Sequence, residues 1–383
     1  MITRQIFEKL RDMATKFPVL TVTGPRQSGK TTLCRQVFSD YRYVSLETPD
    51  VRLFAENDPR GFLEAYKGRV IIDEAQNVPQ LFSYIQGIVD ESKQVGQFIL
   101  TGSQNFLLLE KISQSLAGRV YVFHLLPFNQ IELTQIHKQE VFTAIFKGGY
   151  PVLYDRNVEP GDYFPSYIQT YIERDVRSIL QVKDLNLFSA FLKTCAGRVG
   201  QLFNASAVGA ELGIDYKTVQ SWFSILETSF IVYRLQPWHV NFNKRIVKTP
   251  KIYFYDTGLA NNLLGIKSAE ELQSHYAKGA LFENYVINEH IKNDRNKGNN
   301  NMPFFWRDNI GNEVDLLIDN GNNLKIVEIK SSKTIHADFF KGLNYFDKIQ
   351  QNYQVQRFIT YAGDENRIQF DTKILPWNQL HKI

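Results

Sequence analysis

Cysteine is scarce in this sequence. Cys34 and Cys195 are the only two among 383 residues, and they lie far apart. A pair so widely separated excludes a disulfide framework and a cysteine cluster for zinc, and the histidines show no zinc-like spacing either. Such low cysteine usage is typical of a reducing compartment, so we expect a cytoplasmic protein.

Long hydrophobic runs are also missing. No apolar segment approaches the length of a membrane span. The N-terminal stretch is charged and amphipathic, and it lacks the apolar core of a signal peptide. We therefore expect no membrane partner.

Neither sign of charge is in large excess. Lys and Arg together number 44 against 40 Asp and Glu, which gives a formal net charge of +4. This balance permits nucleic acid as a partner without indicating it. A hydrophobic content of 43% is typical of a globular protein, and 383 residues are too many for one ordinary domain. The sequence thus predicts two or three domains.

A phosphate-binding motif lies near the N-terminus. Residues 19–23 form a β-branched run that predicts a buried strand, and residues 32–38 are compatible with a helix. Between them lies G-x-x-x-x-G-K-[ST], whose glycines let backbone N–H groups turn around phosphate oxygens. We expect Lys30 to place its charge on the terminal phosphates and Thr31 to hold Mg²⁺. The predicted ATP-binding residues in this motif are Gly24, Pro25, Arg26, Gln27, Ser28, Gly29, Lys30, Thr31 and Thr32.

Two acids end the next strong strand signal. The apolar run at residues 70–72 leads into Asp73 and Glu74, as in a central parallel strand. Ligands in doubly wound sheets sit beyond the carboxyl ends of the strands. We therefore predict that Asp73 holds Mg²⁺ and that Glu74 polarises the attacking water as general base. A further strand is predicted before Ser103 and Gln104, and either side chain can reach the terminal phosphate; we include Ser103 in the predicted site.

Arg119 precedes a strand predicted at residues 120–125. We predict that it is an arginine finger, a planar cation supplied by a neighbouring subunit to neutralise charge on the transferred phosphoryl group. The alternative is a helix C-cap, with Gly118 in the left-handed conformation and Arg119 near the negative end of the helix dipole.

The parallel-strand pattern stops at Pro127. Helices are predicted at residues 128–139, 140–146 and 163–176. In the last of these, Arg174 either reaches the nucleotide from a lid or pairs with the neighbouring acids Glu173 and Asp175.

A helix-turn-helix pattern follows. Residues 204–213 and 217–227 predict two helices around a short turn, and a strand is predicted at residues 230–235, so the unit resembles a helix-turn-helix with a wing. Residues suited to a DNA groove or to phosphates are Lys217, Thr218, Gln220, Ser221, Lys244, Arg245 and Lys248. The alternative is a packing module between subunits or domains.

Acidic residues gather in the C-terminal part. A long helix is predicted at residues 272–293, followed by strands at 304–307, 313–318 and 324–330. Glu328 and Lys330 are two apart on one strand and share a face, where Asp315 and Glu283 can join them. Such carboxylates can hold Mg²⁺ or Mn²⁺ against a scissile phosphate, with the lysine positioning water, as in a nuclease. The alternative is buried ion pairing that fixes a sheet.

The motifs as a set resemble a known family. GPRQSGKTTL, VIIDEAQ, LTGSQ, SLAGR, GGYP, YIERDV, YFYDTGLA, FEN, EVD and EIKSS are similar to those of bacterial and archaeal AAA+-type ATPases with a C-terminal domain of uncharacterised function. The resemblance covers nearly the whole chain. It implies an AAA+ core with Arg119 acting in trans, a winged-helix region and a C-terminal domain like the PD-(D/E)XK nucleases. An AAA+ core followed by a winged helix also resembles Holliday-junction branch-migration motors, and the nuclease-like fold resembles archaeal junction resolvases.

These observations predict an α/β protein in three parts. Residues 1–180 are expected to form an AAA+ core with a doubly wound parallel sheet and a helical lid, residues 181–250 a winged helix-turn-helix region, and residues 251–383 a small nuclease-like α/β domain. We expect an ATPase that uses ATP and Mg²⁺, assembles as a homo-oligomer, a hexamer being the expected ring, and acts as a motor on branched DNA. The alternatives are an ATP-controlled regulatory switch and an ATP-gated, metal-dependent nuclease.

Overall fold

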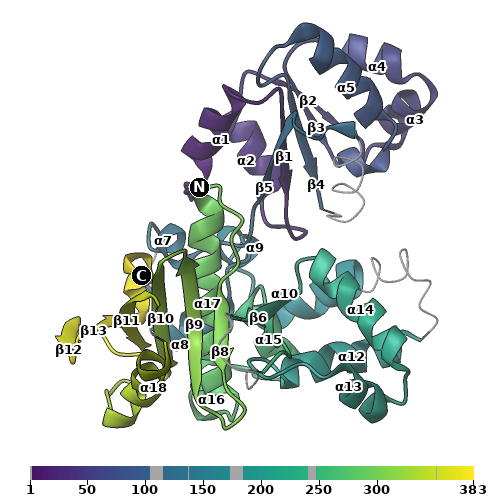
Figure 1. The fold of residues 1–383 in the computed structure, drawn as a ribbon. Coiled ribbons are helices and arrows are strands. Elements are labelled where there is room, and N and C mark those ends of the chain that lie inside the picture. The colour runs from purple at the N-terminus through teal and green to yellow at the C-terminus, as the bar shows by residue number, and fades with distance from the viewer. Residues whose placement is uncertain (1, 104–114, 137, 173–183, 240–246, 351) are drawn as a thin grey trace.

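The computed structural model describes residues 2–103, 115–136, 138–172, 184–239, 247–350 and 352–383. Figure 1 shows two lobes, an upper one that extends through strand β5 and a lower one formed by the rest of the chain. Each described lobe is built on its own sheet.

The upper sheet has five parallel strands in the order β2-β3-β4-β1-β5. These are β1 (Val19–Thr23), β2 (Arg42–Ser45), β3 (Val70–Asp73), β4 (Phe98–Gly102) and β5 (Val120–His124). Val19 is paired with Phe98 on one side and with Val120 on the other, so β1 lies inside the sheet. The predicted parallel sheet is therefore confirmed, together with the apolar strands on which the prediction rested.

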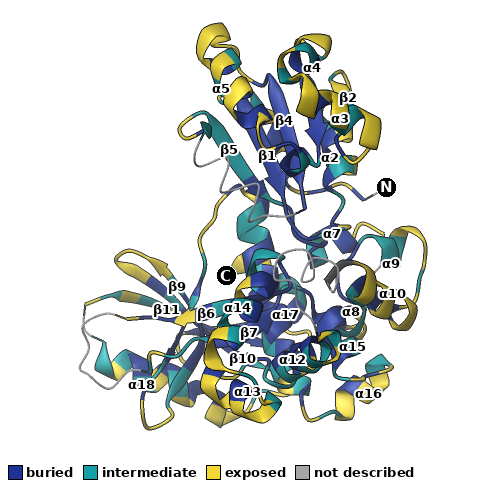
Figure 2. Ribbon diagram, turned by 90° about the vertical axis from the view of Figure 1, so that its right-hand side faces the viewer, coloured by how far each residue is buried: buried dark blue, intermediate teal, exposed yellow. Residues whose placement is uncertain are grey.

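Helices cover both faces of this sheet. They are α1 (Phe7–Ala14), α2 (Lys30–Val37), α3 (Pro49–Asn57), α4 (Pro59–Ala65) and α5 (Leu81–Ser92), with a 3₁₀ turn at Ala75–Asn77. Alternate side chains of a strand point to opposite faces, so Leu20 packs in the cluster that contains α1 and α2, and Val19 in the cluster that contains α4 and α5. In Figure 2 the inner strands β1, β3 and β4 are buried, the edge strand β5 is of intermediate exposure, and the outer sides of these helices are exposed.

Two helix boundaries in this lobe follow from the local sequence. The N-terminal helix α1 begins at Phe7. Asp58-Pro59 separates α3 from α4 and starts the latter, because the Asp58 side chain accepts a hydrogen bond from Gly61 N at 2.9 Å and Pro59 occupies the first helical position.

The lower lobe is rich in helices. Its described helices are α7 (Gln130–Leu133), α8 (Val141–Lys147), α9 (Val152–Asp155), α10 (Pro160–Tyr167) with a π-helical turn at Ile168–Ile172, α12 (Leu185–Gly197), α13 (Ala205–Leu212), α14 (Tyr216–Thr228), α15 (Thr257–Leu263), α16 (Ala269–Ser274), α17 (Lys278–Asn296) and α18 (Lys341–Ile349), with 3₁₀ turns at Ala337–Phe340 and Trp377–Lys382. The expected long helix at residues 272–293 is thus divided between α16 and α17.

The lower sheet is mixed and has eight strands in the order β12-β13-β11-β10-β9-β8-β6-β7. They are β6 (Val232–Pro237), β7 (Lys251–Phe254), β8 (Phe304–Arg307), β9 (Glu313–Asn320), β10 (Asn323–Lys330), β11 (Gln354–Tyr361), β12 (Arg367–Gln369) and β13 (Thr372–Pro376). β6 pairs antiparallel with β7 and parallel with β8. The strand after the helix-turn-helix thus forms an antiparallel pair with β7, and its last two residues continue into the C-terminal sheet through β8.

One hydrophobic cluster joins the helices of the lower lobe to this sheet. It runs from Leu126 to Leu380 and includes Ile145 and Phe164 of the helices that were expected to form a lid on the ATPase core. The Asn261 side chain also donates a hydrogen bond to the Ile145 carbonyl at 2.9 Å. Helices before residue 180 thus share a core with elements after residue 250, so this core extends across the boundaries predicted at residues 180 and 250.

The N-terminal residues also reach the lower lobe. Arg4 forms a buried ion pair with Glu132 at 3.2 Å, and its guanidinium donates to the Leu126 carbonyl at 2.5 Å. At the same junction the Tyr121 hydroxyl donates to the Gly298 carbonyl at 2.6 Å, just beyond the end of α17. The chain therefore passes between the lobes twice, before α1 and after β5.

Candidate nucleotide-binding site and the C-terminal acidic cluster

The phosphate-binding loop connects β1 to α2 at the carboxyl edge of the upper sheet. Gly29 precedes Lys30, the first residue of α2, with a φ of 91° that favours glycine. At Gly24, a Cβ atom would collide with the carbonyl oxygen of Leu125, the residue that follows β5. Gly29 is thus required for its backbone conformation, and Gly24 both for its φ of 148° and for this close approach.

Lys30 is folded onto this loop. Its ammonium donates to the carbonyls of Gly24 at 3.1 Å and Pro25 at 2.8 Å, and the side chain is 6% exposed. Burial lowers the pKa of Lys30 to about 8, although Glu74 and Asp73 act in the opposite direction. Lys30, which was predicted to bind phosphate, is therefore held in place by the carbonyls of Gly24 and Pro25.

Asp73 is surrounded by hydroxyl groups at the end of β3. Its carboxylate accepts hydrogen bonds from Thr31 Oγ1 at 3.0 and 3.1 Å, from the Tyr43 hydroxyl at 2.9 Å and from Thr101 Oγ1. Carboxylate and hydroxyl oxygens are the hard ligands that Mg²⁺ prefers. Thr31 and Asp73, which were predicted to hold the ion, are therefore adjacent and chemically suited to it.

Glu74 has an unusual backbone conformation. Its φ of 53° and ψ of 46° are left-handed, which costs roughly 1–2 kcal/mol for a residue other than glycine. Its carboxylate accepts hydrogen bonds from Ser103 Oγ at 3.2 Å and from the Gln76 side chain. The strained backbone holds the Glu74 carboxylate beside Ser103 at the end of β4, and strain of this kind is typical of functional sites. Gln76 belongs to the VIIDEAQ motif, but no role was predicted for it.

These residues surround a pocket of about 680 Å³, a size that suits a small-molecule ligand. The predicted residues that line it are Arg26, Gln27, Gly29, Lys30, Thr31, Thr32, Asp73, Glu74 and Ser103. Gly24, Pro25 and Ser28 are placed behind this surface, where Ser28 is fully buried. Residues that the sequence reasoning missed also line it, namely Ser45, Glu47, Pro151, Val152, Asp155 and Arg156.

The missed residues at α9 come from the lower lobe. Their loop, Gly148 to Pro151, is fixed by Asp256, which accepts hydrogen bonds from the backbone N–H groups of Gly149 at 2.8 Å and Gly258 at 2.9 Å. Asp256 is 2% exposed, and burial raises its pKa. The GGYP and YDTG motifs therefore form one unit next to the pocket, which no local sequence pattern indicates because more than 100 residues separate Gly149 from Asp256.

Arg119 is placed at the opposite edge of the upper sheet. It comes just before β5, whereas the phosphate loop follows the parallel strand β1. Its guanidinium forms a bidentate ion pair with Asp90 of α5, at 2.5 and 2.9 Å. The Arg119 backbone N–H donates to the Leu116 carbonyl and Gly118 has a φ of 76°, as in a helix C-cap. Arg119 therefore does not face the pocket of its own chain, so as a finger it can act only on another copy.

The helix-turn-helix consists of α13 and α14. The residues predicted to contact DNA differ in their exposure and in the hydrogen bonds that they already make. Lys217 and Lys248 are exposed. The side chain and the backbone N–H of Thr218 are both hydrogen-bonded to Asp215, which caps α14. Gln220 accepts a hydrogen bond from Arg234 at 3.1 Å, and Ser221 is half-buried. The predictions for Gln104, Arg174, Lys244 and Arg245 fall outside the described residues.

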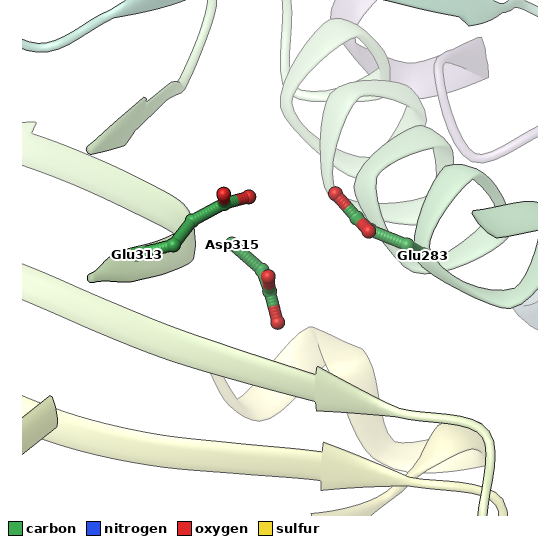
Figure 3. Close-up of side chains that lie close together, drawn as sticks. All are labelled: Glu283, Glu313 and Asp315. Carbon is green, nitrogen blue, oxygen red and sulfur yellow. The ribbon is translucent and has the colours of Figure 1, made fainter. Parts of the chain in front are cut away.

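The C-terminal acidic residues do come together. Figure 3 shows Glu283 on α17 facing Glu313 and Asp315 on β9, and one carboxylate oxygen from each lies within 4.8 Å of the others. Lys330 pairs with Glu328 at 2.5 Å and with Asp315 at 3.7 Å. The structure thus assembles the four predicted residues Glu283, Asp315, Glu328 and Lys330.

Two further residues complete this cluster. Glu313 belongs to the EVD motif without a predicted role, and Lys251 of β7 was not predicted at all. Lys251 is 3% exposed and its ammonium pairs with Glu283 at 2.9 Å and with Glu313. We call Glu283, Glu313, Asp315, Glu328, Lys251 and Lys330 the C-terminal cluster.

The parallel sheet, the phosphate loop and the carboxylates beyond β3 define a P-loop nucleotide-binding domain. Comparison with protein families agrees, because residues 16–134 match the model described as AAA domain. Residues 138–270 match a domain of unknown function, DUF8612, and residues 278–380 match another, DUF4143. The chain thus has an AAA-type ATPase domain followed by two domains whose family descriptions assign no function. Among the described residues, no helix combines the length and apolar character needed to cross a membrane.

Two relatives are similar to this chain over most of its length. The uncharacterized protein Rv2008c of Mycobacterium tuberculosis is 29% identical over 342 residues, which cover 86% of this chain and 74% of that protein. The uncharacterized protein Mb2031c of Mycobacterium bovis gives the same values.

Solved structures are similar only in part. The Walker-type ATPase PABY2304 of Pyrococcus abyssi is 16% identical with a TM-score of 0.42, covering 68% of this chain and 94% of that one. The RuvB Holliday junction branch migration motor of Thermotoga maritima is 18% identical with a TM-score of 0.33, covering 61% and 90%. At such TM-scores we draw no conclusion about this chain from either.

Proposed function

We propose that this chain hydrolyses ATP with Mg²⁺ in the pocket beyond the carboxyl edge of the upper sheet. The observation that supports this most strongly is the convergence of Lys30, Thr31, Asp73, Glu74 and Ser103 from three separate segments on that pocket. A phosphate-binding lysine, a hydroxyl–carboxylate pair for Mg²⁺ and a second carboxylate for water are the parts that phosphoryl transfer to water requires.

Each residue has a defined task in this proposal. Lys30 exchanges the carbonyls of Gly24 and Pro25 for the β- and γ-phosphates of ATP, which are stronger acceptors because they are charged. Thr31 and Asp73 hold Mg²⁺, directly or through water. Glu74 orients and polarises the attacking water, and Ser103, hydrogen-bonded to Glu74, contacts the terminal phosphate.

Assembly completes the site. Because Arg119 lies at the far edge of its own sheet, a neighbouring copy must supply it, and the active form is a homo-oligomeric ring, with six subunits as the expected number. In the isolated chain Asp90 holds the Arg119 guanidinium, so docking has to exchange this ion pair for the phosphate. Hydrolysis therefore depends on protein concentration.

DNA is the partner that we propose for ATP-driven movement, with branched DNA as the preferred form. The support is the exposed beginning of α14, the second helix of the helix-turn-helix, where Lys217 is suited to contact backbone phosphates or a groove. Lys248 is exposed as well. Since the net charge is only +4, we expect a modest number of phosphate contacts.

A regulatory switch is the second candidate. The pocket is lined by residues of both lobes, with Pro151 and Arg156 opposite the phosphate loop. Binding of ATP at such a junction can change how the lobes pack, and so control recruitment of a partner without any movement on DNA.

ATP hydrolysis with different DNAs separates the two candidates. Turnover is measured without DNA and with single-stranded, duplex and four-way-junction DNA, at low and moderate salt. Stimulation by one DNA form that weakens with salt and is lost in Lys217→Ala supports the motor; Ser224→Ala, also exposed on α14, is the control. Equal turnover under all conditions rejects the motor and favours the switch.

A further inference from the structure

The Asp73 carboxylate is held from both neighbouring strands of the upper sheet. β3, which ends at Asp73, lies between β2 and β4. From β2 the Tyr43 hydroxyl donates to Oδ2 of Asp73 at 2.9 Å, and from β4 the Thr101 hydroxyl donates to Oδ1. Each oxygen of the carboxylate therefore has a hydroxyl donor from a different strand, one on either side.

Tyr43 reaches Asp73 because of the register between the two strands. Tyr43 is paired with Ile71, and Ser45 is paired with Asp73, so Tyr43 lies two residues before the position opposite Asp73. Alternate residues of a strand share a face, and Tyr43 packs with Ile71 in the cluster that contains α2. The long tyrosine side chain on this face carries its hydroxyl to the carboxyl edge of the sheet, where Asp73 lies.

The ring of Tyr43 is held in turn by the helix that carries Thr31. The guanidinium carbon of Arg35 lies 4.7 Å from the centre of the Tyr43 ring, and Arg35 follows Thr31 by about one turn of α2. A cation over an aromatic face is attracted by the negative potential of the ring. The strand β2 and the helix α2 thus both direct the Tyr43 hydroxyl at Asp73.

This arrangement matters once Thr31 takes up its proposed task. The Thr31 hydroxyl contacts both oxygens of Asp73, at 3.0 and 3.1 Å, but its own oxygen is needed for Mg²⁺ in the proposed site. Tyr43 and Thr101 then still hold the carboxylate, one on each oxygen. Hydrogen-bonding partners of a metal ligand fix its orientation, and their loss weakens binding of the metal. The residues present therefore fit a carboxylate that is oriented before the ion arrives.

We propose that Tyr43 is a positioning residue of the nucleotide pocket, whose hydroxyl fixes the Asp73 carboxylate in the orientation in which it receives Mg²⁺ together with Thr31. The inference rests on the proposed function and deepens it. It assigns part of the Mg²⁺ affinity of the site to a side chain outside the set of described residues that line the pocket. Tyr43 acts through Asp73 and touches neither ATP nor the ion.

Calorimetric ATP titrations in saturating Mg²⁺ and in EDTA test this role. The ratio of the two ATP affinities measures how strongly the site holds the ion, because free ATP binds Mg²⁺ equally in every experiment. Tyr43→Phe keeps the ring and its contact with Arg35 and removes only the hydroxyl. We expect it to lower this ratio by about 10–100-fold, while the ATP affinity in EDTA stays that of wild type.

Tyr41→Phe is the matched control. Tyr41 comes just before β2, and its hydroxyl donates to the Gly96 carbonyl at 2.8 Å, near the opposite edge of the sheet. Urea denaturation should find similar losses of stability in the two variants, since each loses one hydroxyl donor, but Tyr41→Phe should keep the wild-type ratio. A ratio that is unchanged in Tyr43→Phe, or lowered equally in both variants, would overturn the inference alone. If wild type binds no ATP in either condition, the proposed function fails, and this inference fails with it.

Discussion

The Asp256 carboxylate accepts a hydrogen bond from the backbone N–H of Gly149 at 2.8 Å, across more than 100 residues of sequence. Its other oxygen accepts from Gly258 and Leu259 at the beginning of α15. One buried side chain thus caps a helix of the lower lobe and fixes the loop that places Pro151 beside Gly29 of the phosphate-binding motif. The nucleotide pocket is therefore organised from both lobes.

Substitution Asp256→Asn tests this link. The amide turns an NH₂ group toward one of the three N–H donors, so we expect a loss of about 1–3 kcal/mol in the free energy of unfolding. ATP affinity should also fall, because the Gly149–Pro151 loop loses its anchor. Urea denaturation and calorimetric ATP titration measure the two effects. The matched control is Asp215→Asn, which alters the exposed cap of α14 and should leave ATP affinity unchanged; equal affinities for wild type and Asp256→Asn would refute the link.

The pKa of Lys30 predicts how ATP affinity depends on pH. In the free protein this pKa is lowered to about 8, mainly by burial, whereas bound phosphates favour the charged ammonium and raise it. Below pH 8 the lysine is already protonated. Above pH 8 binding must take up a proton, so affinity should fall by up to about tenfold per pH unit. Titrations of ATP between pH 7 and pH 9.5 measure this.

Lys30→Arg provides the control for that series, because a guanidinium stays charged throughout the range. We expect its ATP affinity to be lower than that of wild type but independent of pH. A wild-type affinity that is constant from pH 7 to pH 9.5 would show that proton uptake by Lys30 does not accompany binding.

Arg119 can be tested by mixing inactive variants. Arg119→Ala should reduce ATP turnover by about 10³-fold or more if the residue is an arginine finger. A chain with Arg119→Ala keeps Glu74 and a chain with Glu74→Gln keeps Arg119, so mixing the two should restore part of the turnover in an oligomer. Mixing Arg119→Ala with the double variant should restore none. Unchanged turnover in Arg119→Ala alone would favour the helix C-cap interpretation.

Local patterns predicted the upper lobe well. The apolar runs before the phosphate loop and before Asp73 are interior parallel strands, as expected. Such strands are buried on both faces, so they appear in the sequence as nearly continuous apolar runs that are easy to recognise. Thr31 and Asp73 are 42 positions apart, and their meeting followed from the rule that the carboxyl ends of parallel strands share one edge. The sequence-based argument was thus strongest where a topological rule applies.

Contacts between distant elements could not be predicted in the same way. Lys251 meets Glu283 and Glu313 because β7 pairs with β6 and α17 packs on the same sheet, which depends on the order of strands rather than on any spacing in sequence. Arg156 reaches the pocket through the loop that Asp256 holds. The strand β6, which was expected to form a wing, also pairs on its other side with β8, nearly 70 residues further along the chain, and no local pattern indicates this.

The most direct test of the central claim compares wild type with Glu74→Gln. Phosphate release and ATP binding are measured on the same preparations, at a protein concentration that allows assembly. The proposed site predicts that wild type hydrolyses ATP, and that Glu74→Gln loses about 10²–10⁴-fold in turnover because the general base is gone, while it still binds ATP through Lys30 and Thr31. Equal turnover in the two proteins, or no ATP binding by either, would contradict it.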